Sequence, residues 1–175
     1  MTASKINSEI PVRPTEADIE LLASTQSSAL AVRDLYHSAV DAGAGGDHVA
    51  SLVAIAAHHD AYAQSISSLI GRAAPQARDD KLFAANKSDF GADTTKVALA
   101  AHTLENSLVA AHTEIIGQLE GSEGAALMAS IVVTEARHVV ALAAIAGKSP
   151  IDDIELFLAT PEVAVAEAQT TNTIA

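Results

Sequence analysis

The chain has 175 residues, of which 49% are hydrophobic and 3% aromatic, and its Ala-rich apolar content predicts one globular domain of closely packed helices rather than a sheet. Its formal net charge is −12, from 22 acidic against 10 basic residues. Because such a surface repels phosphate groups, the composition excludes nucleic acid and anionic membrane as favoured partners, whereas cations are concentrated near it.

Residues 1–14 are polar and close on a proline, which predicts an N-terminal tail. The first helix starts directly afterwards with Thr15 as its N-cap, and its apolar period runs to a glycine-rich break at 43–46. We expect Asp47 to cap a second helix. That helix ends at Gly71, a residue suited to the left-handed conformation that often closes a helix.

A polar, turn-rich connector follows over residues 72–93, in which only Lys81–Ala85 has the pattern of a short helix. Residues 93–94 then open a third long helix that continues to Gly121. After a tight turn, a fourth helix occupies roughly Glu123–Ala146. The second and third long helices are therefore joined by a much longer segment than the other pairs.

Ser149 can start a short fifth helix that runs through Phe157. We divide the chain into the polar tail 1–14, a helical domain 15–158 and an acidic, Ala-rich tail 159–175. Four long helices joined by short, long and short connections predict an all-α, up-down four-helix bundle. Its one long crossover runs from the second helix to the third.

The chain contains no cysteine, which excludes a disulfide framework and a thiolate metal site. Any bound metal would therefore be held by oxygen and imidazole ligands. Residues 1–13 lack the apolar core of an export signal, and no apolar run reaches membrane-spanning length without polar interruption. We expect a cytoplasmic protein without a membrane span, unless an export leader has been removed.

The clearest chemistry in the sequence is Glu135 followed three residues later by His138, within the apolar fourth helix. This spacing puts both side chains on one helix face, where nearly all their neighbours are apolar. A lone buried carboxylate costs on the order of several kcal/mol, so it needs a metal ion, a base on another helix, or retained water. A Glu-x-x-His pair facing a bundle interior is the ligand motif of carboxylate metal proteins.

An internal repeat relates the two predicted hairpins, because a shift of 76 residues places Gly45 on Gly121 and Gly71 on Gly147. Polar positions coincide in the same register. The coinciding pairs are Ala29 with Glu105, Tyr36 with His112, His59 with Glu135, and Tyr62 with His138. We therefore predict that the first and third of these pairs point into one central cavity at similar height.

The chain resembles the ferritin-like superfamily, which includes bacterioferritins and rubrerythrins, and is most similar to its actinobacterial branch. The likeness covers about residues 16–147. It is carried by Leu30–Tyr36, His58–Gln64, Leu104–Asn106 with His112, and Glu135–His138. The resemblance implies that each hairpin gives one Glu from its first helix and a Glu-x-x-His from its second, and that together these groups bind two irons.

This sequence keeps only the second half of that pattern. Glu105, Glu135 and His138 match it, whereas Ala29 stands where the first Glu is expected and His59 replaces the Glu of the other motif. Two carboxylates neutralise one divalent ion, and a second ion would lack compensation. We therefore expect no di-iron ferroxidase chemistry and at most one metal ion per chain.

The predicted metal ligands are Glu105, Glu135, His138 and His59, and this donor set suits Fe²⁺, Mn²⁺ or Zn²⁺. Four further side chains are expected around the ligands: His112, His102, Tyr36 and Tyr62. His58 should point about 100° away from His59, toward solvent or a neighbouring helix.

Two other interpretations stay open. In the first, the same groups form a satisfied polar cluster in a non-catalytic structural or interaction protein. In the second, the chain is a di-iron oxidase with a substituted site. Association of copies through helix faces into a homo-oligomer is compatible with all of these interpretations.

Overall fold

The computed structural model describes residues 11–149 and 151–157, and the regular elements within these ranges are all helical. The α-helices are α1 (Glu16–Asp41), α2 (Val49–Ile70), α3 (Asp80–Asn86), α4 (Thr94–Gln118) and α5 (Ser122–Ile145). Short 3-10 helices lie at Gly46–His48, Gly71–Ala73, Lys87–Asp89 and Ile154–Phe157. The predicted tails fall almost entirely outside the described residues.

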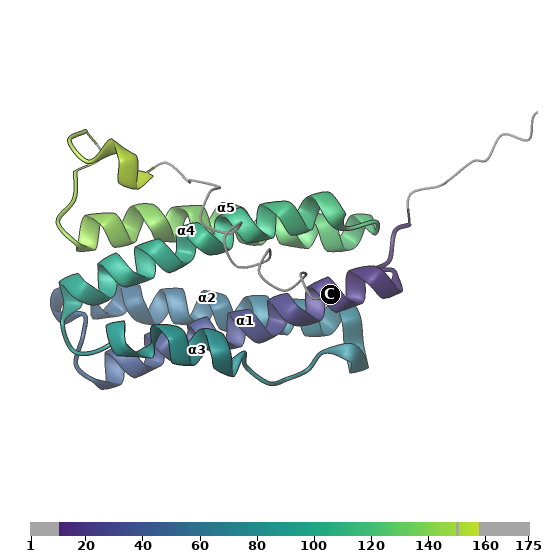
Figure 1. Cartoon of the computed structure of the whole chain (residues 1–175), viewed down its shortest axis with the longest axis horizontal. Coiled ribbons are helices and arrows are strands. Elements are labelled where there is room, and N and C mark those ends of the chain that lie inside the picture. The colour runs from purple at the N-terminus through teal and green to yellow at the C-terminus, as the bar shows by residue number, and fades with distance from the viewer. Residues whose placement is uncertain (1–10, 150, 158–175) are drawn as a thin grey trace, which may run out of the picture.

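Two antiparallel hairpins build the bundle, α1 with α2 and α4 with α5, and they pack against each other along their length (Figure 1). The connector that contains α3 runs back along the bundle, from the end where α2 finishes to the end where α4 begins, and α3 packs beside α1 (Figure 1). This is the long crossover that the connection lengths predict. The all-α bundle is therefore confirmed.

The start of α1 is fastened to the turn between α4 and α5. Thr15 and Asp18 form a reciprocal capping box, and the Asp18 carboxylate also accepts hydrogen bonds from the backbone N–H groups of Glu120 (2.9 Å) and Gly121 (2.8 Å). Burial would raise the pKa of Asp18, but these donors outweigh it and lower the pKa. One carboxylate thus joins the two hairpins at this end of the bundle.

Most predicted helix ends are confirmed, with two corrections. Gly71 has the expected positive φ of 60°, and Asp93 caps α4. Asp47 does not cap the second helix, because the glycine break extends into the 3-10 helix Gly46–His48 and α2 begins only at Val49. The predicted fifth helix is a turn and a 3-10 helix instead of an α-helix.

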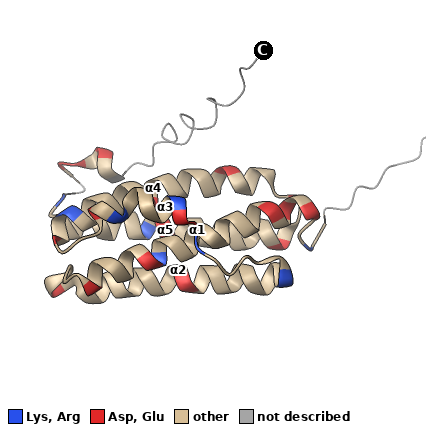
Figure 2. Cartoon of the chain, turned by 60° about the horizontal axis from the view of Figure 1, so that its bottom comes forward, with Lys and Arg blue, Asp and Glu red and all other residues tan. Residues whose placement is uncertain are grey.

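The core is made mainly of small and aliphatic side chains, with the aromatic side chains of Tyr36, Phe83 and Phe90 among them. Charged residues are sparse over long stretches of the helices (Figure 2). α5 is the one described helix that is long and apolar enough, by composition alone, to cross a membrane. Here it packs along α4 as a bundle helix, with Glu135 and His138 buried on its inner face. Together with Arg137, those two residues are the polar interruption that the sequence shows.

Candidate metal centre

Three of the four predicted ligands meet in the bundle interior, each from a different helix. His59 of α2, Glu105 of α4 and His138 of α5 are all buried, and one ligand atom of each lies within 4.8 Å of the others. The amphipathic pattern explains the meeting, because each residue lies on the inward stripe of its helix. The resulting group offers one carboxylate and two imidazoles.

Glu105 is the centre of this group. Its Oε1 accepts a hydrogen bond from the Tyr36 hydroxyl (2.9 Å) and lies 2.9 Å from His59 Nε2, while its Oε2 lies 3.3 Å from His138 Nδ1. Burial would raise the pKa of Glu105, but the facing imidazoles of His59 and His138 outweigh burial and lower the pKa to about 2. The carboxylate is therefore ionised at neutral pH.

The two groups that face Glu105 Oε1 respond to its charge. Burial lowers the pKa of His59, but the charge of Glu105 outweighs burial and raises it. Burial first, and then the charge of Glu105, raise the pKa of Tyr36 well above its usual value. Tyr36 is therefore a neutral hydrogen-bond donor that helps to orient the carboxylate.

Glu135 is buried beside this group but is not one of the three that converge. Its Oε2 lies 2.8 Å from His112 Nδ1, and its charge contributes to the raised pKa values of His59 and Tyr36. The 76-residue repeat accounts for the His112 contact. Tyr36 bonds Glu105, but His112, its equivalent in the other hairpin, would find Ala29 at the matching position and contacts Glu135 instead.

Ala29 itself is buried and packs with Leu30, Ala63 and Tyr62, so it offers no ligand. Tyr62 lies edge-on to His59 and stacks on His138, at ring-centroid distances of 5.2 Å and 6.5 Å. Through these contacts Ala29 and Tyr62, two of the positions matched by the repeat, lie next to the site.

His138 is held from the outside by a residue that sequence reasoning did not assign to the site. His58 Nδ1 lies 2.8 Å from His138 Nε2, and the two rings are stacked with an interplanar angle of 4°. The turn of about 100° between His58 and His59 directs His58 at α5, so it contacts a neighbouring helix while remaining exposed. The adjacent His-His pair in the sequence was the available signal.

Four buried side-chain atoms in the described part of the chain have no hydrogen-bond partner, and all four lie in this region. They are Glu105 Oε2, Glu135 Oε1, His138 Nδ1 and Tyr62 Oη. The 3.3 Å contact of His138 Nδ1 with Glu105 Oε2 lacks hydrogen-bond geometry. Each buried orphan costs about 1–3 kcal/mol. Two carboxylate oxygens and an imidazole nitrogen are the donor atoms that a divalent cation takes, so the residues fit a metal.

The model of the ferritin-like domain family matches residues 18–148, which is most of the chain. The chain belongs to the ferritin-like family. The comparisons with curated proteins and with solved structures gave no match. As a ferritin-like protein it combines the crossover bundle with an interior in which Ala29 and His59 occupy two of the positions where the family resemblance implies carboxylates.

One predicted neighbour of the ferritin-like site lies elsewhere. His102 is buried one turn before Glu105, but its Nε2 contacts the carbonyl oxygen of Leu156, and it lies 3.5 Å from the amide nitrogen of Asn106. It therefore fastens the segment after α5 to α4 and does not reach the ligands. The spacing of His102 and Glu105 predicts a shared stripe, but the path of the later segment decides the partner.

Proposed function

We propose that this ferritin-like bundle binds one divalent metal ion per chain, with Glu105, His59 and His138 as its ligands and Glu135 as the second carboxylate of the site. The observation that carries the proposal is the set of unpartnered buried atoms, because three of the four belong to these residues. A cation placed among them would replace several unsatisfied polar groups with coordinate bonds.

The charges of the site support one ion rather than two. Glu105 and Glu135 together balance one M²⁺, and the imidazoles act as neutral ligands. A second ion would need the carboxylates that are missing at Ala29 and His59. A bound Fe²⁺, Mn²⁺ or Zn²⁺ would supply Lewis acidity, and iron or manganese also redox chemistry. The protein residues would hold the ion in the bundle interior and exclude water from it.

A specific set of contacts favours a second candidate function, a non-catalytic bundle with a vestigial site. The contacts of His59 with Glu105 and of His112 with Glu135 pair each buried carboxylate with an imidazole in the absence of metal. In this alternative the cluster contributes only to the stability and the specificity of the bundle.

Native mass spectrometry separates the two candidates. Protein purified without chelator, dialysed and given Zn²⁺, Mn²⁺ or anaerobic Fe²⁺ should retain one ion per chain. His138→Ala should lose that ion, and His37→Ala, which changes an exposed histidine of α1, should keep it. Retention of no ion by the wild type would favour the vestigial cluster. Equal retention by the two variants would show that the ion binds elsewhere.

A further inference from the structure

A groove of about 560 Å³ lies on the outside of the bundle between α2 and α5, beside the candidate metal centre. We call it the α2–α5 groove. Apolar side chains, Ala54, Ile55, Ala61 and Ala141, form part of its wall, together with His58 and Arg137. Tyr62 also lines it, and the Tyr62 hydroxyl is one of the unpartnered buried atoms. Its size falls within the usual range of small-molecule sites.

The charge of the α2–α5 groove differs from that of the rest of the molecule. The chain has a net charge of −12, yet no Asp or Glu lines this groove. Arg137 is exposed, and its guanidinium makes no hydrogen bond or ion pair with any residue in 11–149 or 151–157. An uncompensated arginine beside an apolar wall is complementary to a small molecule that carries one anionic group and an apolar body.

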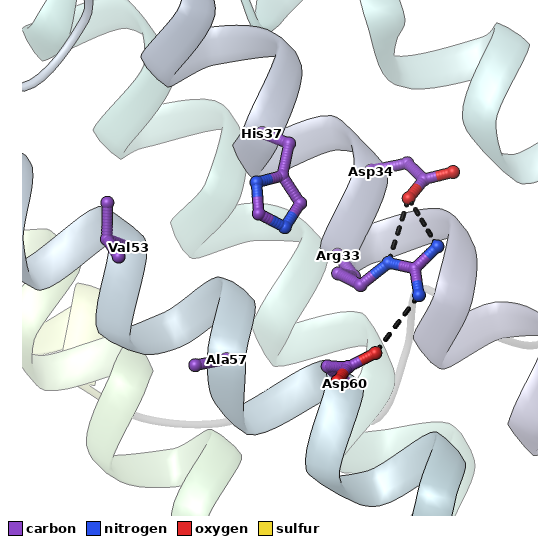
Figure 3. Close-up of a pocket in the computed structure, with 6 residues that line it drawn as sticks. All are labelled: Arg33, Asp34, His37, Val53, Ala57 and Asp60. Atoms are coloured by element: carbon purple, nitrogen blue, oxygen red, sulfur yellow. Dashed lines mark hydrogen bonds and ion pairs between the residues drawn. The ribbon is translucent and has the colours of Figure 1, made fainter.

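In a second groove of similar size, the charge of an arginine is compensated by acidic side chains of the chain itself. Arg33 lies in a pocket of about 580 Å³ between α1 and α2, where Asp34 and Asp60 also line the wall (Figure 3). Its guanidinium nitrogens lie 2.7 Å from Asp34 and 3.0 Å from Asp60, so its hydrogen-bonding positions are taken by carboxylates of the chain itself. The α2–α5 groove offers Arg137 no such partner among its lining residues.

We propose that the α2–α5 groove binds a small aliphatic monocarboxylate, with the carboxylate on Arg137 and the hydrocarbon chain along the alanine wall. A guanidinium binds a carboxylate through two parallel hydrogen bonds, and the apolar wall contributes burial of the chain. His138, a ligand of the proposed metal, also lines the groove, but the inference rests on Arg137 and the apolar wall and does not depend on a bound metal.

Hexanoate is a suitable probe, with hexanamide as its neutral counterpart. Both are titrated into the full chain in EDTA, and binding is followed by amide chemical shifts. We expect hexanoate to shift signals of groove residues such as Ala54 and Ala141, and hexanamide to bind at least about tenfold more weakly, a difference of about 1.4 kcal/mol. Arg137→Gln should weaken hexanoate binding by a similar factor. Arg72→Gln, which changes an exposed arginine outside the groove, should leave it unchanged.

Three results would overturn the proposal. The first is equal affinity of the wild type for hexanoate and hexanamide, which would show that only the apolar wall contributes. The second is equal hexanoate affinity of the wild type and Arg137→Gln. The third is the absence of hexanoate binding in EDTA, including the case in which binding appears only after metal is added. Amide spectra of both variants show directly whether the fold is kept, so a folding defect is not mistaken for lost binding.

Discussion

His58 Nδ1 and His138 Nε2 lie 2.8 Å apart, so Nδ1 is the nitrogen of His138 that faces Glu105 and the candidate metal centre. If the hydrogen on His138 is on Nε2 and is donated to His58, Nδ1 is left with a free lone pair facing Glu105. Outer contacts of this kind usually orient a histidine ligand and raise its basicity. His58 thus acts on the site through His138.

Replacing His58 should therefore weaken metal binding without removing it. We expect His58→Ala to lower the affinity about 10–100-fold, the usual effect of losing such a partner. Competition against a chromogenic chelator measures the change. His48→Ala provides the control, because His48 is exposed and makes no side-chain cap at the start of α2. Equal losses in the two variants would argue against the role of His58.

The metal-free protein should lose stability in acid through Glu105. The pKa of Glu105 is lowered in the folded state from 4.5 to about 2, so its contribution is fully present above pH 4.5 and is lost as pH falls from 4.5 toward 2. Urea unfolding in EDTA at several pH values should show this decline in the free energy of unfolding. Glu105→Gln should flatten it, and an unchanged pH dependence in that variant would contradict the assignment.

The contribution of His59 to stability depends on pH with the opposite sign, because the pKa of His59 is raised from 6.5 in the folded state. Its contribution is fully present below pH 6.5 and is lost as pH rises through the higher folded value. In the same unfolding series, stability in EDTA should therefore also decline on the alkaline side. His59→Ala should remove that alkaline decline.

The arrangement of the bundle was largely predictable because helix ends carry local signals. Thr15, Gly71 and Asp93 each determine a helix end through their own side chain or φ angle, and the connection lengths then restrict the topology. The prediction that Asp47 caps α2 was wrong because a capping residue type alone does not give the conformation of the glycines before it. A cap residue acts only where the backbone is already extended.

The candidate site was partly predictable. The repeat predicted that His59 and Glu105 face the same interior, and the spacing of Glu135 and His138 predicted that His138 lies on the inward face of its helix. The contacts of His58 and His102 were not predictable in the same way. Helical spacing gives the direction of a side chain around its own helix, but its partner depends on how a neighbouring element is rotated and displaced.

The oxidation of iron distinguishes a site that binds one ion from a site that binds two. Because the proposed site has only the two carboxylates of Glu105 and Glu135, a second iron has no compensating charge, and we expect no rapid oxidation of Fe²⁺ by O₂. Anaerobic protein with two Fe²⁺ per chain is mixed with oxygenated buffer, and ferric absorbance is followed. A stoichiometric burst corresponding to two irons per chain would contradict this expectation.

The turn between α4 and α5, to which the start of α1 is fastened, should be sensitive to a single methyl group. A Cβ on Gly121 would lie 2.6 Å from the carbonyl oxygen of Arg13 and 2.9 Å from Asp18 Oδ2, so Gly121→Ala should destabilise the protein by about 1–3 kcal/mol. Gly117→Ala is the matched control in α4, where the new Cβ meets no atom within 4 Å, and it should be neutral or stabilising. Chemical denaturation of both variants tests the difference.

A thermal melt in the presence and absence of metal tests the central claim most directly. A cation that binds the folded chain stabilises it by about 2.7 kcal/mol at a hundredfold excess over its dissociation constant. For a domain of this size the melting temperature should then rise by several degrees. We predict this rise with at least one of Zn²⁺, Mn²⁺ and anaerobic Fe²⁺ relative to EDTA, and its loss in Glu105→Gln. Identical wild-type curves in all four conditions would contradict metal binding and leave a bundle whose buried carboxylates are paired only with histidines.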